Sequence, residues 1–437
     1  MFYKLKYPDL VNLCKKKQQI LETNDIDQRK RIQIWKFNHQ WKLCYETLKF
    51  YKNYREKNKL PNLISNLSEI INFPIIDKKY ILENYEDILI DYKNSKFTLT
   101  GGTSGEVIKF PTSYLNEEQN FINKIICKNW INSNKGEKTL YIWGHSHKFG
   151  NNFFKKKFNT FFNKFKDLDQ NRFRLSAYDM SQENLEIIHQ AIRSNNFDII
   201  FSYASTFEIL SKYLLFKNYK HQKKIKLIFT SEHLSEECIQ NLIKIFPEGK
   251  IIGEYGMAET GIIAYSMDIH EEYKVIWSDF IIQNIDGKIL ISEIANKHFP
   301  LINYCPDDQI IVNDKTINEN SIFSFFNIKG KERPFIDLKF DNHTVQKISL
   351  IVFDHLFKNI ETVFSVQYFI NSNEDKLIII FSGDSKIENL MSTINSYFKR
   401  KILNIELIKI QCPIKTKAGK FKTILDEKDF SNIKLSN

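Results

Sequence analysis

Short apolar runs alternate with amphipathic segments through the middle of the chain. The segments that predict strands are residues 139–143, 173–176, 198–203, 226–230 and 250–255. Apolar residues recur at helical spacing in residues 116–130, 182–193, 206–216 and 235–246. Apolar strands that alternate with amphipathic helices are typical of a parallel sheet covered on both faces. The pattern therefore predicts an α/β unit here.

The first hundred residues are predicted to be mostly helical. From the Asp25 region onward, large apolar side chains recur at roughly helical spacing, and we expect this stripe to pack on a core. The stripe consists of Ile32, Trp35, Trp41, Tyr45, Leu48 and Tyr51. Another helix is predicted after Pro74, with Asp77 as its N-cap.

The pattern changes after Tyr273. Short strands separated by turns predict a small antiparallel barrel or sheet near residues 273–315. These strands are residues 275–277, 280–282, 289–292 and 310–312, with a turn at Asp286-Gly287. The last hundred residues predict a second α+β unit, with helices at 345–357 and 387–400 and strands at 364–369, 376–381 and 405–410. The boundary is expected at residues 328–331.

Composition narrows the class of protein. The 437 residues are 42% apolar, which fits a folded chain of two or three domains. No apolar run approaches the roughly 18 residues of a membrane helix, and the N-terminus does not resemble a signal peptide. The six cysteines show neither zinc-site nor disulfide spacing. A cytoplasmic protein with reduced thiols is expected.

The formal charge of +11 is compatible with a nucleic-acid or anionic-membrane partner. However, the lysines are dispersed over the whole chain beside abundant Asn, Ile and Phe, which indicates a compositional bias rather than a basic patch. We therefore expect no nucleic-acid partner.

The segment from Thr98 to Phe110 is rich in glycine and hydroxyl residues. Glycines let backbone N–H groups approach a ligand closely, and successive N–H groups form an anion site. The segment contains Thr100, Gly101, Gly102, Thr103, Ser104, Gly105 and, slightly displaced, Lys109. This chemistry suits a polyphosphate, although a glycine-rich surface turn between two strands is the alternative. The order is not that of a Walker loop.

A second segment runs from Gly253 to Gly261. It places an aromatic ring, a glycine and a carboxylate at the end of a predicted strand. Tyr255 can stack on a base. Glu259 can bind Mg²⁺, which prefers oxygen ligands. The alternative is a strand-to-turn junction with a solvated glutamate.

Three further segments carry polar groups in the second half of the chain. Tyr304-Cys305-Pro306-Asp307-Asp308 ends in carboxylates, whose two oxygens suit a diol. Residues 328–333 form a basic segment with Lys331 and Arg333. Residues 415–422 place Lys420 beside Gly419, where a lysine can reach developing negative charge. The alternative is a polar turn for the first segment, a solvated linker for the second and a lysine-rich tail for the third.

Together the five segments resemble, in order, the motifs of the adenylate-forming enzymes. The loop at residues 100–105 and the segment Thr230–Leu234 look most like the phenylacetate–CoA ligase branch and its capsular-polysaccharide-associated relatives. The resemblance implies an α/β protein with a large multi-sheet N-terminal domain at residues 1–329. It also implies a small, mobile α+β C-terminal domain at residues 330–437.

The resemblance also implies site residues. Phosphates are assigned to Thr100, Gly101, Gly102, Thr103, Ser104, Gly105 and Lys109. Adenine and ribose are assigned to Ser231, Glu232, Tyr255, Gly256, Asp308 and Lys331. Glu259 is the Mg²⁺ ligand and, with Lys420, a catalytic residue; His145, Tyr203, Ala204 and Ser205 are acyl-pocket candidates by position. Ala258, Asp307 and Lys331 depart from the family pattern.

The implied activity is ATP- and Mg²⁺-dependent activation of a small carboxylate or amino acid as an acyl-adenylate. Pyrophosphate is released, and a CoA-type thiol or an amine then accepts the acyl group, in surface-polysaccharide or secondary metabolism. An adenylyltransferase that stops at AMP transfer and a catalytically weak nucleotide-binding relative are the alternatives. The sequence identifies neither the acid nor the acceptor, nor the oligomeric state.

Overall fold

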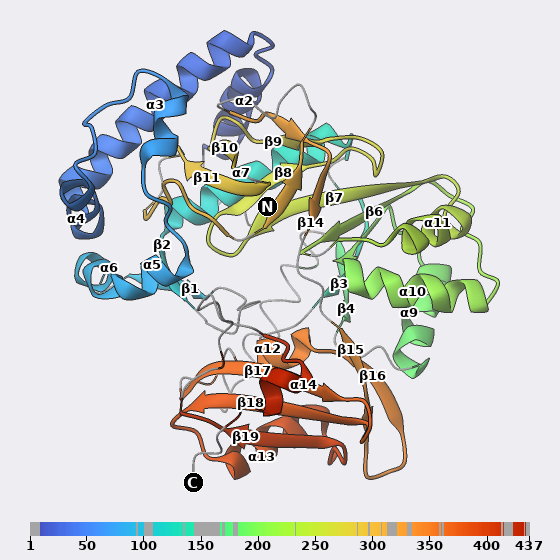
Figure 1. Cartoon of the computed structure of the whole chain (residues 1–437). Coiled ribbons are helices and arrows are strands. Elements are labelled where there is room, and N and C mark those ends of the chain that lie inside the picture. The colour runs from blue at the N-terminus through green and yellow to red at the C-terminus, as the bar shows by residue number, and fades with distance from the viewer. Residues whose placement is uncertain are drawn as a thin grey trace.

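The computed structural model describes most of the chain (Figure 1). The residues outside the description are 1–8, 93–94, 100–107, 134–135, 144–166, 168–170, 178–181, 232, 286, 296–297, 307, 313–320, 330–333, 358–359, 361, 412–413, 415–422, 432 and 434–437. The fold is α/β, with a large multi-sheet N-terminal domain and a smaller C-terminal domain. The boundary predicted at residues 329 and 330 stays a prediction, because residues 330–333 are not described.

An eight-stranded sheet organises the large domain. Its parallel strands are β3 (Thr139–Trp143), β4 (Arg172–Ser176), β5 (Ile199–Tyr203), β6 (Ile225–Thr230) and β7 (Gly249–Met257). The antiparallel strands β8 (Gly261–Tyr265), β9 (Tyr273–Val275) and β13 (Ser324–Phe325) continue it beyond β7. The order is β13-β9-β8-β7-β6-β5-β3-β4, so β7 is the strand at which the sheet changes from parallel to antiparallel.

Helices cover both faces of the parallel strands, as predicted. Helix α7 (Tyr114–Trp130) packs on the face that carries Ile228 and Ile252. The opposite face is covered by α9 (Gln182–Ser194), α10 (Ala204–Phe216) and α11 (Glu236–Ile245). The three helices form the green layer of Figure 1. The apolar runs and amphipathic segments predicted between residues 116 and 255 match these elements to within a few residues.

The N-terminal helices are α2 (Leu10–Leu21), α3 (Ile26–Thr47), α4 (Lys49–Asn58), the 3₁₀ helix η1 (Leu67–Asn72), α5 (Lys78–Glu83) and α6 (Tyr85–Tyr92). Asp77 caps α5 as predicted, because its carboxylate accepts the Tyr80 N–H at 2.7 Å. Trp41 and Tyr51 are fully buried in the helical core.

The predicted core position of Trp35 is wrong. Its side chain is 68% exposed and stacks on His39, with ring centroids 6.1 Å apart. The buried stripe of α3 runs through Gln33, Phe37 and Trp41 instead, which leaves Trp35 on the solvent side of the helix. The helical spacing of apolar residues alone did not show which side of α3 faces the core.

Two smaller sheets belong to the large domain. Strands β1 (Lys96–Leu99) and β2 (Lys109–Thr112) form an antiparallel hairpin. Strands β10 (Phe280–Ile285), β11 (Lys288–Glu293), β12 (Gln309–Ile311) and β14 (Asn327–Lys329) form an antiparallel sheet, in which Ile285 pairs with Lys288. Of the two alternatives, barrel or sheet, the described strands form a sheet. Of the strand predicted at 275–277, only Val275 lies in a strand, at the end of β9 in the large sheet.

The C-terminal body forms around its own core (orange and red in Figure 1). It consists of β15 (Phe335–Lys339), β16 (Val345–Ser349), α12 (Ile351–Phe357), β17 (Val363–Asn371), β18 (Lys376–Gly383), α13 (Ile387–Phe398), β19 (Ile405–Lys409) and α14 (Glu427–Ser431). The helix predicted at 345–357 is wrong in its first half. Residues 345–349 are a strand, because they pair with β15.

The described part of the chain contains no helix long and apolar enough to cross a membrane. Among the described residues, Cys14, Cys44, Cys127, Cys238 and Cys305 are free and buried.

Candidate functional site

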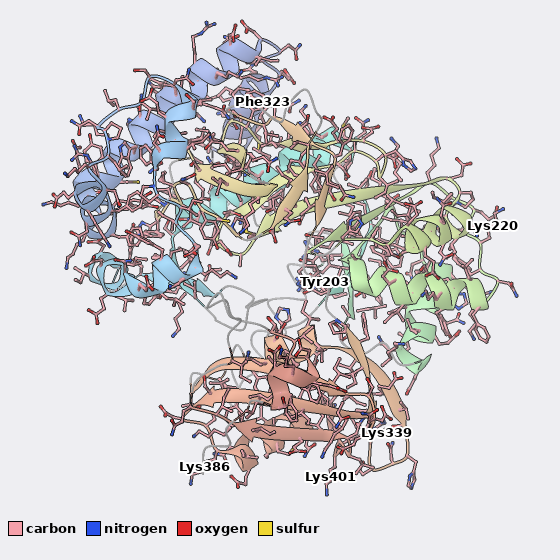
Figure 2. All side chains as sticks on the ribbon, viewed as in Figure 1. Tyr203, Lys220, Phe323, Lys339, Lys386 and Lys401 are labelled. Carbon is pink, nitrogen blue, oxygen red and sulfur yellow. The ribbon has the colours of Figure 1, made fainter. Side chains whose placement is uncertain are left out.

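The parallel strands end at one edge of the large sheet, where ligands bind in open α/β folds. Tyr203 ends β5, and its ring stacks on that of Trp143 at the end of β3, with centroids 4.0 Å apart. Ala204 is fully buried as the first residue of α10. Figure 2 shows Tyr203 on the side of the large domain that faces the C-terminal body. These two acyl-pocket candidates therefore do lie at the carboxyl edge.

Ser231 follows β6 at the same edge in a left-handed backbone conformation, with φ of +73°. A non-glycine residue rarely adopts this conformation, and such backbone strain concentrates at ligand sites and turns. The hydroxyl side chain is exposed. The predicted nucleotide segment thus begins with an unusual backbone geometry at the sheet edge.

The second motif continues from the end of β7 into the hairpin turn that leads to β8. The register between β7 and β8 shifts between Tyr255 and Gly256. A Cβ atom on Gly256 would lie 2.4 Å from the carbonyl oxygen of Gly261, which is far closer than side chains allow. A glycine is therefore required at residue 256 for the two strands to approach at this bulge.

The structure brings the second and third motifs together through two hydroxyl–carboxylate contacts. The Tyr255 hydroxyl donates to Oδ2 of Asp308 at 3.0 Å, across 53 residues of sequence. The Tyr304 hydroxyl donates to Oε1 of Glu259, also at 3.0 Å, across 45 residues. Each motif therefore supplies one tyrosine and one carboxylate to the other.

Both tyrosines are buried, whereas both carboxylates are half-exposed. Tyr255 is 7% exposed and Tyr304 is 0% exposed. Burial, followed by the charge of the bonded carboxylate, raises the pKa of each phenol well above its ordinary value. The two hydroxyls therefore remain protonated donors and orient Asp308 and Glu259 toward the surface.

The backbone of Tyr304 is anchored in the small sheet. Its N–H donates to the Ile291 carbonyl at 2.8 Å, and its carbonyl accepts the Ile291 N–H at 2.9 Å. A further bridge joins it to Ile76. Glu259 leaves the large sheet while Tyr304 belongs to the small one, so the site spans the seam between two sheets.

The turn between Met257 and Gly261 contains Ala258, one of the three predicted departures from the motif pattern; the other two, Asp307 and Lys331, lie outside the described residues. Ala258 is exposed and carries no hydroxyl. Thr260 is 2% exposed, and its hydroxyl donates to the Gly261 carbonyl at 3.1 Å. The hydroxyl of Thr260 is thus engaged within the turn.

Several predicted site residues lie outside the described residues. They are Thr100, Gly101, Gly102, Thr103, Ser104, Gly105, His145, Glu232, Lys331 and Lys420, together with the side chain of Ser205. Lys109 is described as the exposed first residue of β2, opposite Leu99. The predicted phosphate loop therefore joins two antiparallel strands.

The residues around Glu259 fit a Mg²⁺ ion. Mg²⁺ is usually bound by one or two carboxylates, and substrate phosphates and waters supply the other ligands. Glu259 offers an oriented, half-exposed carboxylate. Within the described residues, no group of three or more His, Cys, Asp or Glu side chains forms a dedicated metal cage.

No protein-family model and no curated protein sequence matches the chain. Among solved structures, the chain is similar to 2-hydroxyisobutyryl-CoA ligase in complex with 2-HIB-AMP and CoA in the thioesterification state. The TM-score is 0.55 with 11% identity, covering 94% of this chain and 92% of that one. An open conformation of the same ligase with both ligands gives a TM-score of 0.53 and 11% identity over 93% of each chain.

The chain has the fold of the adenylate-forming enzymes. A third structure of the ligase, in the postadenylation state with R3-HIB-AMP, gives a TM-score of 0.53 and 10% identity over 94% of this chain and 92% of that one. The fold likeness extends over both domains because the coverage is nearly complete on both sides.

Sequence reasoning did not assign a role to Tyr304. Tyr304 lies in the third motif, but only the hydrogen bond from its hydroxyl to Glu259 in the folded structure shows that it orients this carboxylate.

Proposed function

We propose that the chain is an adenylate-forming ligase that activates a carboxylic acid with MgATP and transfers the acyl group to a thiol or an amine. The observation that carries the proposal is the crosswise pairing of Tyr255 with Asp308 and of Tyr304 with Glu259 at the edge of a parallel sheet. The likeness in fold to an acyl-CoA ligase with bound 2-HIB-AMP and CoA supports it.

Asp308 and Tyr255 are proposed to hold the nucleoside. An ionised carboxylate accepts hydrogen bonds at two oxygens, which suits the two hydroxyls of a ribose. The Tyr255 hydroxyl fixes the rotation of this carboxylate. The tyrosine ring is proposed to pack against adenine. Gly256 has no side chain, so the backbone at Gly261 can approach it closely.

Glu259 is proposed to hold Mg²⁺ at the phosphates. The bound ion would neutralise charge on the phosphate oxygens. Tyr304 orients the carboxylate from the buried side, in the way that outer-shell partners orient metal ligands.

In the first half-reaction, a carboxylate oxygen of the acid attacks the α-phosphorus of ATP. The bond from that phosphorus to the bridging oxygen breaks, and pyrophosphate leaves with the electron pair. In the second, a thiol or amine attacks the acyl carbon and AMP leaves. The protein contributes mainly positioning and charge stabilisation. The loop at residues 100–105 and Lys109 would bind phosphates, and Lys420 would stabilise charge at the α-phosphate.

The C-terminal body is proposed to move between the two half-reactions. Structures of 2-hydroxyisobutyryl-CoA ligase are named for open, postadenylation and thioesterification states. The finer assignments to the phenylacetate–CoA ligase-like branch, to capsular polysaccharide biosynthesis and to the cytoplasm rest on the sequence resemblance. We expect no nucleic-acid partner, because the lysines are dispersed.

A catalytically weak nucleotide-binding relative is the second candidate. Ala258 lacks the hydroxyl of the family pattern, and the Thr260 hydroxyl donates to a backbone carbonyl. Binding of MgATP without ATP–pyrophosphate exchange for any acid would favour this candidate over the ligase.

The test is ATP–pyrophosphate exchange with a panel of carboxylic acids. At least one acid should support exchange, and Glu259→Gln should slow it by about tenfold to a thousandfold, equivalent to ~1.4–4 kcal/mol of barrier. Glu248→Gln is the matched control, because it makes the same change at an exposed residue before β7. An unchanged rate for Glu259→Gln at low Mg²⁺ would remove Glu259 from the site.

A further inference from the structure

Net positive charge is concentrated in the first 60 residues. The lysines are dispersed over the whole chain, but the carboxylates are not. Residues 1–60 contain 15 Lys and Arg against six Asp and Glu, whereas the other 377 residues contain 48 and 46. The first 60 residues therefore carry +9 of the formal charge of +11. Such an asymmetry is typical of a segment that meets an anionic partner.

Helix α3 presents a row of exposed side chains to the solvent. Arg31, Trp35, His39 and Leu43 are each four residues apart, so they lie one above another on the helix. Trp35 is 68% exposed and Leu43 is 40% exposed, and the other two side chains are exposed as well. Lys42, seven residues after Trp35, is exposed on the same face.

This face lies at the outer margin of the large domain, on the side away from the C-terminal body (blue in Figure 1). The basic character continues onto the helices before and after α3. Exposed lysines on α2 and α4 are Lys15, Lys16, Lys52 and Lys57. The solvent face of α3 is therefore part of a broad basic surface.

The two cations of the face are only weakly held by carboxylates. Arg31 lies 3.9 Å from Asp25, and Lys42 lies 3.9 Å from Glu46, with all four side chains more than half exposed. Exposed ion pairs of this kind contribute little to stability. Both cations can therefore turn to an external anion at small cost.

The residue types on this face indicate the kind of partner. An indole and an aliphatic side chain beside Lys and Arg on a helix are typical of attachment to the interface of an anionic membrane. A convex helix face matches a broad, flat surface and cannot enclose a small ligand. A second copy of the chain would bring like charges together across the contact.

We propose that the solvent face of α3 attaches the protein to membrane surfaces that contain anionic lipids. Trp35 and Leu43 enter the headgroup region, and Arg31 and Lys42 bind lipid phosphates. The attachment is peripheral, because it uses side chains on the outside of a folded helix. None of these residues belongs to the candidate site, so the inference does not depend on the proposed ligase activity.

The experiment measures co-sedimentation of the full chain with vesicles of phosphatidylcholine, with and without phosphatidylglycerol. Binding should require phosphatidylglycerol and should weaken as salt is added. Each basic residue near an anionic surface strengthens binding about fivefold, so Arg31→Gln with Lys42→Gln should weaken it about 25-fold. Lys386→Gln with Lys401→Gln is the matched control, because it removes two exposed lysines from the C-terminal body and should preserve binding (Figure 2).

Tryptophan fluorescence gives an independent measurement. The chain has five tryptophans, of which Trp41 and Trp277 are buried whereas Trp35 is 68% exposed. Vesicles with phosphatidylglycerol should shift the emission to shorter wavelength. Trp35→Ala should remove this shift and weaken binding about tenfold, because less apolar surface enters the interface.

Several outcomes would overturn the inference. They are absent binding, equal binding to both kinds of vesicle, an equal loss in the control pair, and an emission shift that survives Trp35→Ala. Tighter binding to duplex DNA than to the vesicles would point to a nucleic acid instead. A dimer that Arg31→Gln with Lys42→Gln dissociates would assign the face to a second copy of the chain.

Discussion

Removing the Tyr304 hydroxyl tests the proposed metal site without touching its ligand. Tyr304→Phe keeps the buried ring and deletes only the donor that lies 3.0 Å from Glu259. Tyr255→Phe is the matched variant, because it deletes a donor at the same distance from the other carboxylate, Asp308. The two changes should separate metal binding from nucleoside binding.

The magnitude follows from the kind of bond lost. A hydrogen bond to a charged group contributes about 1.5–3 kcal/mol, and loss of an outer-shell partner lowers metal affinity about 10–100-fold. Tyr304→Phe should therefore raise the Mg²⁺ concentration for half-maximal exchange by about tenfold or more. Glu259 is half-exposed, so water partly replaces the donor and the effect should lie at the low end.

The assay measures ATP–pyrophosphate exchange at varied Mg²⁺, with ATP and with 2′-deoxy-ATP. Tyr304→Phe should shift the Mg²⁺ dependence and keep the preference for ATP over 2′-deoxy-ATP. Tyr255→Phe should weaken that preference and keep the Mg²⁺ dependence, because Asp308 loses the bond that fixes its rotation. Thermal unfolding of both variants checks that the fold is retained.

Two results would refute this reasoning. If both variants shifted both readouts equally, the hydroxyls would serve only to hold the two sheets together. If neither readout changed in either variant, the crosswise contacts would have no part in nucleotide binding.

Three further predictions concern other parts of the chain. Lys17→Met should destabilise the fold by about 3–5 kcal/mol in urea unfolding, because it leaves Asp279, 2% exposed, without its buried partner; Lys17→Met with Asp279→Asn should recover most of the loss. Gly256→Ala should cost about 1–3 kcal/mol of stability and most of the exchange activity, because its Cβ meets the Gly261 carbonyl; wild-type stability would contradict the bulge geometry. Lys420→Ala should slow exchange about a hundredfold but spare transfer from a supplied acyl-adenylate, and equal loss in both half-reactions would argue against domain alternation.

Local patterns predicted most of the architecture. Four of the five parallel strands contain runs of consecutive apolar residues, so their bounds could be predicted closely from the sequence. Trp35 and residues 345–349 show the limit. Which side of α3 faces the core, and whether Val345–Ser349 is a strand, depend on partners elsewhere in the chain.

The candidate site could be predicted only as separate motifs. Spacing within a segment gave Tyr255, Glu259 and Asp308 as polar groups near strand ends. The pairing of Tyr304 with Glu259 arises from the contact between two sheets, and no periodicity contains that information.

The position of the site across the seam has a thermodynamic consequence. A nucleotide that touches Tyr255 and Asp308 together can bind only while the large sheet and the small sheet are both folded and in contact. By linkage, such a ligand stabilises the native state and penalises every partly opened form in which either sheet has separated. With nucleotide bound, the large and the small sheet would therefore unfold together as one cooperative unit. Amide hydrogens of β7 and β11, although they belong to different sheets, would then exchange at a common, slower rate.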